Sequence, residues 1–328
     1  MLVPIEGPAA WTGADLVSRT DWIHVLSPAE VADIDRVVAL VRRLEAPLEK
    51  LTREDVAFDA LAPAVAAWRE DLAHGRGFLL VRGLPVERMS VEDAVAAYWA
   101  LGLHLGNPVP QNLSSEVLTH VRDTGADPSA PSTRLYKTRA EQDFHTDGAD
   151  VIGLLCLRGS KRGGESRIVS SISVVNQIGK KWPELVPVLF RDFYWHYFEP
   201  EMASPVHFTR PICREQGSRL NTFFIPWYIR RAQELADVPR MTDEQNAALE
   251  ALEATANDPA LYLDMEFRPG DIQFLKNSVI LHKRTEYEDW DEPDRKRHLV
   301  RLWLAAPDFD DGDAQLRQGI SQDALGSV

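Results

Sequence analysis

The chain has 328 residues, of which 45% are hydrophobic, so it can build a sizeable buried core. Its formal net charge of −14 repels phosphate backbones and anionic headgroups, so neither nucleic acid nor a membrane is an expected partner. No apolar run approaches the ~18 residues of a membrane-spanning helix, and the N-terminus does not resemble a signal peptide. The only two cysteines, Cys156 and Cys213, do not indicate a disulfide framework, which predicts a cytoplasmic protein.

The first part of the chain is predicted to be helical. Ser27-Pro28-Ala29-Glu30 combines a capping serine, a proline in the first turn and a glutamate that can reach back to the cap. A second helix is expected over residues 63–73, ending near Gly75. A strand over 77–83 and an amphipathic helix over 90–103 follow.

From about Tyr136 onward, short β-rich runs alternate with turn residues. Helices are expected over 226–236 and 242–256. The predicted strands cover residues 151–157, 166–172, 193–198, 206–213, 220–225, 261–267, 272–275 and 298–305. Many short strands with Gly and Pro turns favour a sandwich or barrel. We predict a single domain over 1–328, with a helical part over about 1–75, a β-rich core over 76–306 and a tail over 307–328.

Phe144-His145-Thr146-Asp147 is the sharpest local motif. On a strand, residues i and i+2 point to the same face, so His145 and Asp147 could bind one metal ion. A third ligand would complete the facial triad of non-haem Fe(II) oxygenases. Taken alone the motif is weak, and a surface pair or a hydrogen-bonded core histidine is the alternative.

His282 is the candidate third ligand. It follows two apolar stretches that begin at the turn Pro269-Gly270-Asp271, and it could reach the metal from a neighbouring strand. The alternative is a histidine at the end of a strand that caps a backbone carbonyl.

Arg297 and Arg301 lie on the last predicted strand and are four residues apart, so both project to one face. A guanidinium binds a carboxylate through two parallel hydrogen bonds. Leu299 and Trp303 share that face, and buried arginines need anionic partners. The pair therefore suggests a pocket for an acid, although two solvent-facing arginines are the alternative.

The order of these motifs resembles the TauD/TfdA family of 2-oxoglutarate dioxygenases, which includes clavaminate-synthase-like enzymes. The match runs through His145-x-Asp147, Gly163-Gly164-Glu165-Ser166, His282, Arg297 and Arg301, and similar-looking pieces extend it over about 68–305. The resemblance implies a mainly β protein with a double-stranded β-helix (jelly roll) core and flanking helices. It also implies Fe(II), 2-oxoglutarate and O2 as cofactors.

Residue roles follow from the resemblance. His145, Asp147 and His282 would be the catalytic metal ligands. Arg297 would bind the distal carboxylate of 2-oxoglutarate with help from Ser166, and Arg301 would lie nearer the primary substrate. The remaining candidates for the substrate pocket are Gln111, Asn112, Tyr136 and Phe144. Candidates for orienting the ligands are Thr146, Asn277 and Thr285, and the polar stretch 112–139 is a candidate lid.

Two assignments stay open at this point. Because the gap from His282 to Arg297 is long for the family, Arg295 or Arg301 could instead hold 2-oxoglutarate. The hydroxyl could instead come from Ser170, Ser171 or Ser173.

The expected reaction is hydroxylation of an unactivated C–H bond of a small substrate, with an anionic or amino-acid-like compound as one candidate. Succinate and CO2 would be released. Desaturation, epoxidation or cyclisation of a natural-product intermediate is an alternative on the same scaffold. Two alternatives come from other functional classes. One is a cupin-like metal-dependent hydrolase or isomerase, which has no need of a buried arginine pair. The other is a non-catalytic ligand-binding jelly roll. A homo-oligomer is compatible with the sequence.

Overall fold

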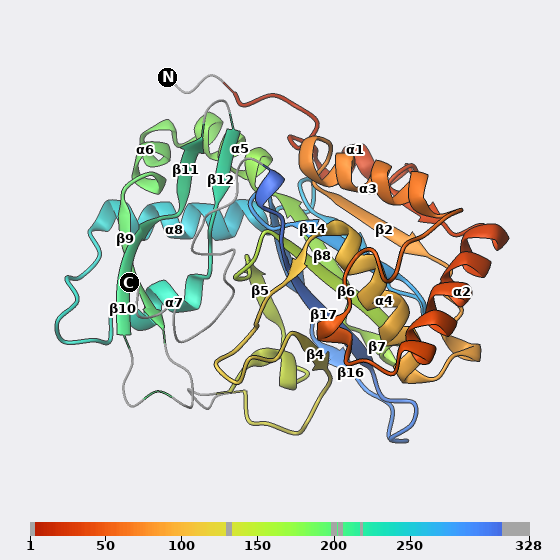
Figure 1. Cartoon of the computed structure of the whole chain (residues 1–328). Helices are drawn as coiled ribbons and strands as arrows, with labels where there is room; N and C mark the ends of the chain where they lie inside the picture. Colours follow the sequence, from red (N-terminus) through yellow and green to blue (C-terminus); the bar gives the residue numbers. More distant parts are fainter. Residues whose placement is uncertain (1–3, 129–132, 198–201, 203–205, 217–218, 310–328) are drawn as a thin grey trace.

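Two β-sheets packed face to face form the centre of the computed structural model, which describes residues 4–128, 133–197, 202, 206–216 and 219–309 (Figure 1). The larger sheet has the strand order β1-β2-β14-β6-β17-β3, with β4 also paired to β17, and the smaller sheet has the order β13-β8-β15-β5. Neighbouring strands are antiparallel except for β1 and β2. The expected jelly-roll core with flanking helices is confirmed.

The strands of the larger sheet are β1 (Ile23–Val25), β2 (Phe78–Arg82), β3 (Asn107–Pro108), β4 (Leu118–Val121), β6 (Val151–Arg158), β14 (Ile272–Lys276) and β17 (His298–Ala305). Those of the smaller sheet are β5 (Gln142–His145), β8 (Ser166–Ser170), β13 (Leu263–Met265) and β15 (Ile280–Arg284). β1 falls in the part predicted to be helical, and β4 falls in the predicted lid over 112–139. Both segments therefore contribute to the larger sheet.

Helices from the first third of the chain cover the outer face of the larger sheet (Figure 1). They are α2 (Pro28–Leu44), α3 (Ala62–His74) and α4 (Val91–Leu105), preceded by the short α1 (Gly13–Leu16). The capping box at α2 is present as predicted, with Ser27 accepting from the Glu30 amide and Glu30 accepting from the Ser27 amide. Their buried side chains pack on Val300, Leu302 and Leu304 of β17.

A second layer of helices covers the outer face of the smaller sheet (Figure 1). It contains α5 (Ser171–Lys181), α6 (Val186–Leu189) and α8 (Asp243–Ala256), whereas α7 (Pro226–Ala232) packs on β9 (Asp192–Tyr197). The strand predicted over 166–172 ends at Ser170, because the Ser170 side chain accepts a hydrogen bond from the Ser173 amide and starts α5 there. The sequence prediction missed this helix.

Short pairs and turns complete the fold. The pairs are β7 (Arg162–Gly163) with β16 (Tyr287–Glu288), β9 (Asp192–Tyr197) with β10 (Val206–Pro211), and β11 (Cys213–Gln216) with β12 (Arg219–Thr222). The 3-10 turns are η1 (Leu48–Lys50), η2 (Val86–Arg88), η3 (Leu135–Lys137), η4 (Pro183–Leu185) and η5 (Pro307–Phe309). The rest of the predicted tail, 310–328, lies outside the described residues. Across the described part of the chain, no helix is long and apolar enough to cross a bilayer.

The Pro-Gly-Asp turn is fixed by a buried ion pair. Asp271 is fully buried, and Arg82 donates to its two oxygens at 2.9 and 2.8 Å. Gly270 has a φ of 86°, and a Cβ there would lie 2.0 Å from the carbonyl oxygen of Leu84. The turn thus holds the start of β14 against the end of β2, and β14 leads directly toward the strand that carries His282.

Replacing Asp271 by alanine is expected to lower the free energy of unfolding by about 3–5 kcal/mol, because it leaves the Arg82 guanidinium without its buried partner. Chemical denaturation measures this change. Asp264→Ala is the matched control, since the Asp264 side chain is 47% exposed where it pairs with Arg167 and should contribute within about 1 kcal/mol. Equal losses in the two variants would contradict this account of the turn.

Candidate active site

His145 and His282 face each other across two neighbouring strands. β5 pairs with β15 in the register that sets His145 directly opposite His282. Paired residues share a face of the sheet, and the ring centroids are 4.2 Å apart. Two histidines far apart in the sequence therefore point together into the space between the sheets.

Asp147 lies beyond the end of β5, so strand alternation does not place it. Asn277 holds its backbone instead: the Asn277 side chain accepts from the Asp147 amide and donates to the Asp147 carbonyl, both at 2.8 Å. Thr146 is bonded to Phe224, donating its amide to the Phe224 carbonyl at 2.7 Å and accepting from the Phe224 amide at 2.9 Å. Thr285 contacts Glu165 rather than the Asp147 segment.

The three side chains offer nitrogen or oxygen atoms that all lie within 4.8 Å of one another. Asp147 Oδ1 is 4.0 Å from His145 Nε2, and Asp147 Oδ2 is 3.6 Å from His282 Nε2. His145 Nδ1–H donates to the Asp143 carbonyl at 2.7 Å, which makes Nε2 the acceptor nitrogen. In this structure Nε2 accepts from the Gln142 side-chain amide at 3.0 Å, a contact that a metal ion at Nε2 would replace. Two imidazoles and one carboxylate in this arrangement fit the facial triad of a non-haem Fe(II) site.

Burial and neighbouring charges keep two of these groups in the forms that bind a metal. Burial, with His282 nearby, lowers the pKa of His145 to about 3, so its imidazole is neutral at physiological pH. Burial alone would raise the pKa of Asp147, but Arg301 and the two histidines outweigh it and hold that pKa below its usual range. A neutral imidazole and an ionised carboxylate can bind a cation without first losing a proton.

Arg301 lies beside the metal-ligand cluster. Its Nη1 is 3.4 Å from Asp147 Oδ2, and its Nε donates to Gln111 Oε1 at 2.7 Å. The guanidinium carbon lies 5.2 Å from the ring centre of Tyr136 and 4.9 Å from that of Trp303. The structure thus brings Gln111, Tyr136 and Arg301 together next to Asp147.

Arg297 is buried without a carboxylate partner among the described residues. Its guanidinium makes one long hydrogen bond, from Nη2 to the Gly164 carbonyl at 3.4 Å, and Nη1 has no partner. Burial lowers the pKa of Arg297, with Tyr287 opposing that shift. Ser166 pairs with Arg284 on the inner face of the smaller sheet, and its hydroxyl contacts the Gln273 amide at about 3 Å. The buried Arg297 guanidinium, with Nη1 unpaired, could accommodate an acidic ligand.

The alternative residues have other partners. Arg295 is largely exposed, pairs with Glu292 and stacks on Trp290. Ser170 and Ser173 donate to backbone carbonyls of the N-terminal segment. The remaining serine, Ser171, accepts from the Thr222 hydroxyl. Ser166 is therefore the candidate that we retain.

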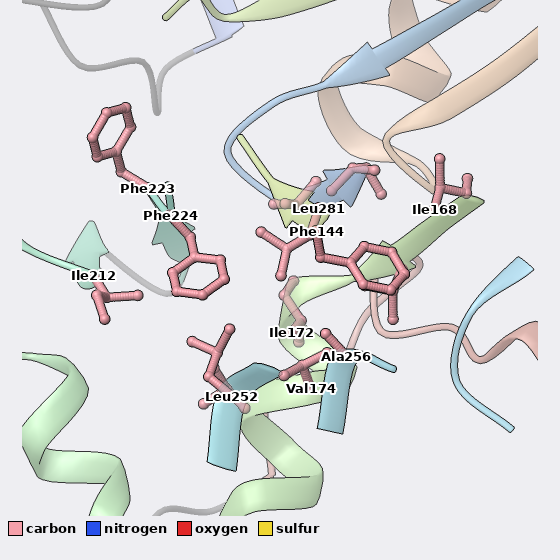
Figure 2. Packing of buried hydrophobic residues seen from close by; sticks show 14 of the residues in the cluster. Phe144, Ile168, Ile172, Val174, Ile212, Phe223, Phe224, Leu252, Ala256 and Leu281 are labelled. Atoms are coloured by element: carbon pink, nitrogen blue, oxygen red, sulfur yellow. The ribbon is translucent and has the colours of Figure 1, made fainter. Parts of the chain in front are cut away.

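Two predicted pocket residues are not brought to the metal ligands. Phe144 precedes His145 on β5 and so faces the opposite side of the sheet, where it packs with Leu281, Ile172 and Leu252 under the helices (Figure 2). Phe144 therefore belongs to the hydrophobic core and does not line a pocket at the metal ligands, contrary to the sequence prediction. The Asn112 side chain instead closes a local turn with Glu116.

Three aromatic or charged residues near the site were missed from the sequence. The Trp227 ring centre lies 5.0 Å from that of His145, and Trp227 packs against Tyr228 on α7. Arg134 donates to the Tyr228 hydroxyl at 3.4 Å, and the Asp147 charge acts on its pKa. The only available signal was the run Pro226-Trp227-Tyr228 at a predicted helix start, which is equally typical of core packing.

Comparisons with known proteins agree with this geometry. Residues 43–303 match the family model described as taurine catabolism dioxygenase TauD, TfdA family. FR-33289 synthase from Streptomyces rubellomurinus is 27% identical over 92% of this chain and 90% of that protein. An asparagine oxygenase, solved with Fe(II), hydroxyasparagine and succinate, is similar in structure with a TM-score of 0.71 at 17% identity, covering 86% and 93% of the two chains. The non-heme iron oxygenase OrfP, solved with Fe and alpha-ketoglutaric acid, has a TM-score of 0.66 at 14% identity over 86% and 93%.

Asn277→Ala is expected to weaken metal binding about 10- to 100-fold, because the Asp147 backbone loses both of its anchoring hydrogen bonds. Anaerobic titration with Fe(II) or Co(II) measures the affinity. Asn246→Ala, which removes an exposed amide on α8, is the control and should bind the metal normally. An unchanged affinity in Asn277→Ala would show that other contacts position Asp147.

The metal-free protein is expected to lose stability as the pH falls below the ordinary histidine value of 6.5. Burial lowers the folded-state pKa of His145 to about 3 and that of His298 to about 4, so the unfolded chain binds more protons in this range. The stabilisation is complete above pH 6.5 and is lost progressively toward the folded-state values. Denaturation curves on both sides of pH 6.5 show whether the free energy of unfolding falls as the pH falls. His298→Asn should make this pH dependence less steep.

Proposed function

The chain belongs to the TauD/TfdA family of dioxygenases, and from this premise we propose that it uses Fe(II), 2-oxoglutarate and O2 to hydroxylate a C–H bond of a small acidic substrate. The observation that carries the proposal is a His-Asp-His cluster together with two arginines: Arg301 on β17, which contacts Asp147, and Arg297, which is buried directly before β17.

His145, Asp147 and His282 would hold the metal. The donor set fits Fe(II), and the contacts of Asn277 and Asp143 would keep the ligands oriented. When bound, Fe(II) with 2-oxoglutarate supplies the oxidising chemistry, and succinate and CO2 are released. The protein's own contribution is to bind, orient and shield the reactants.

Arg297 would bind the distal carboxylate of 2-oxoglutarate, with Ser166 nearby on the inner face. Its Nη1 is buried and has no hydrogen-bond partner in the described structure, and an unpaired buried cation is costly. A dicarboxylic co-substrate removes that cost, which a hydrolase or isomerase reaction on the same metal would not do.

Arg301 would bind an acidic group of the primary substrate. It is preoriented by Gln111 and by the rings of Tyr136 and Trp303, while Trp227 stands beside His145. The solved neighbours are an asparagine oxygenase and an OrfP complex with a hydroxylated arginine, so amino acids are a reasonable first substrate class. Desaturation, epoxidation and cyclisation are distinguished from hydroxylation by product mass.

The function is tested by succinate release. Fe(II)-loaded protein is incubated with 2-oxoglutarate, O2 and a panel of amino acids and other small acids, and succinate and the product masses are measured. A substrate should raise succinate formation and gain one oxygen atom. Protein that binds neither Fe(II) nor 2-oxoglutarate would contradict the proposal.

The two arginines are expected to act on different ligands. Arg297→Ala should raise the apparent KM for 2-oxoglutarate thirtyfold or more, since losing a charged partner costs roughly 2–5 kcal/mol. Arg301→Ala should instead weaken binding of the primary substrate. Decarboxylation of 2-oxoglutarate should continue in this variant without forming hydroxylated product. Anaerobic titration of 2-oxoglutarate into both variants, with Arg295→Ala as control, measures the change in 2-oxoglutarate affinity directly. The reverse pattern would exchange the two assignments.

A further inference from the structure

Two buried guanidiniums flank one tyrosine beside the expected co-substrate site. The guanidinium carbons of Arg284 and Arg297 lie 5.3 and 4.9 Å from the ring centre of Tyr287. Arg284 follows His282 by two residues on β15, so both side chains point between the sheets. Tyr287 is held next to them because β16 pairs with β7 and sets it opposite Gly163.

Each of these three residues presents a buried polar atom that lacks a hydrogen-bond partner: Arg284 Nε, Tyr287 Oη and Arg297 Nη1. Within the described part of the chain, neither guanidinium forms an ion pair with a carboxylate. Asp289 accepts from the Arg297 backbone amide through Oδ1, and its buried Oδ2 has no hydrogen-bond partner. The charges of Asp289 and Asp123 act on Arg297 and Arg284 without a hydrogen bond to either guanidinium. An anion that accepts from both guanidiniums would supply the direct contacts that these carboxylates do not make.

Arg284 also holds the chain segment that forms one wall of the substrate pocket. Its Nη2 donates to the Ala140 carbonyl and, at 3.3 Å, to the Leu135 carbonyl. Between these two carbonyls lies Tyr136, whose ring packs on the Arg301 guanidinium. One side of Arg284 thus binds residues 135–140, while its Nε remains available.

We propose that Arg284 and Tyr287 join Arg297 to form a three-donor seat for the distal carboxylate of 2-oxoglutarate, and that this contact fixes residues 135–140. The proposal rests on the proposed function, which places that carboxylate at Arg297. A carboxylate has two oxygens with about four acceptor positions, and the two N–H groups and one O–H group can share them. Because the same guanidinium binds the 135–140 carbonyls, the seated co-substrate holds Arg284 and thereby orders Tyr136 against Arg301.

The first test compares two 2-oxo acids in anaerobic calorimetric titrations of the Fe(II)-loaded protein. 2-Oxobutyrate has the metal-chelating end of 2-oxoglutarate but no distal carboxylate. Tyr287→Phe should lower the affinity for 2-oxoglutarate about tenfold or more, and Arg284→Gln should lower it about thirtyfold or more. Both variants should bind 2-oxobutyrate as the unchanged protein does. Arg295→Gln, an exposed arginine outside the seat, is the matched control.

The second test measures hydrogen exchange at the amides of residues 137–140 with and without saturating 2-oxoglutarate. The co-substrate should protect these amides in the unchanged protein and in Tyr287→Phe, and should fail to do so in Arg284→Gln. Melting temperatures measured without ligand identify any variant that has lost its fold. Tyr287→Phe removes only one hydroxyl, so the calorimetric test can still be made with this variant if Arg284→Gln does not fold.

The outcomes separate this proposal from the proposed function. If Arg297→Ala loses 2-oxoglutarate but Tyr287→Phe and Arg284→Gln bind it normally, the three-donor seat is wrong and the co-substrate assignment survives. If Tyr287→Phe and Arg284→Gln lose 2-oxoglutarate selectively while Arg297→Ala does not, the three-donor seat is overturned together with the proposed role of Arg297, because Arg297 is one of its donors. Equal weakening of both 2-oxo acids would overturn the seat, because the distal carboxylate would then not be the group recognised.

Discussion

The pairing of β5 with β15, in the register that sets His145 opposite His282, is the contact on which the site depends. Side chains alternate along a strand, so a slip of one residue would turn one histidine away from the other. The register is fixed from the outer face, where Phe144 and Leu281 pack beneath α5 and α8 (Figure 2). The apolar core on one face of the strands therefore specifies the geometry of the polar cluster on the other.

Buried positive charge is the second constraint. Arg284 on β15 and Arg297 directly before β17 are buried, and the Arg301 side chain on β17 is only 12% exposed. Arg301 has Asp147 as a partner, whereas the other two guanidiniums, within the residues that the structure describes, donate only to backbone carbonyls and pack on the ring of Tyr287. Under the proposed function these guanidiniums would bind acidic molecules although the chain carries a net charge of −14. The net charge of the chain therefore does not predict the charge of the ligand.

Sequence patterns predicted most of the long elements because their signals are local. The capping serines of α2 and α4 and the apolar runs of β6 and β17 were recognisable without tertiary information. The start of α5 at Ser170 was missed, since Ile172 and Val174 suit a strand as well as a helix face. β1 was missed because three residues give no measurable periodicity.

The site was predictable where ordered motifs carried it and not where tertiary contacts did. His145, Asp147 and His282 were identified by type and order, but the reason given for Asp147 was incorrect, since Asn277 rather than strand alternation places it. Phe144 was assigned to the substrate pocket, but alternation along β5 turns its side chain away from His145 and into the core. Trp227 reaches His145 from α7, and such long-range contacts leave no local signature.

Asn277 holds the backbone of Asp147, and two donors from β17 hold its carboxylate, so the loss of this side chain would leave those two donors in place. Arg301 Nη1 and Trp303 Nε1 both donate to its Oδ2, at 3.4 and 3.2 Å. Shortening Asp147 to alanine would leave two N–H donors, one of them charged, around the vacated volume. That niche would attract a small inorganic anion such as chloride more readily than water, because an unpaired buried guanidinium is costly.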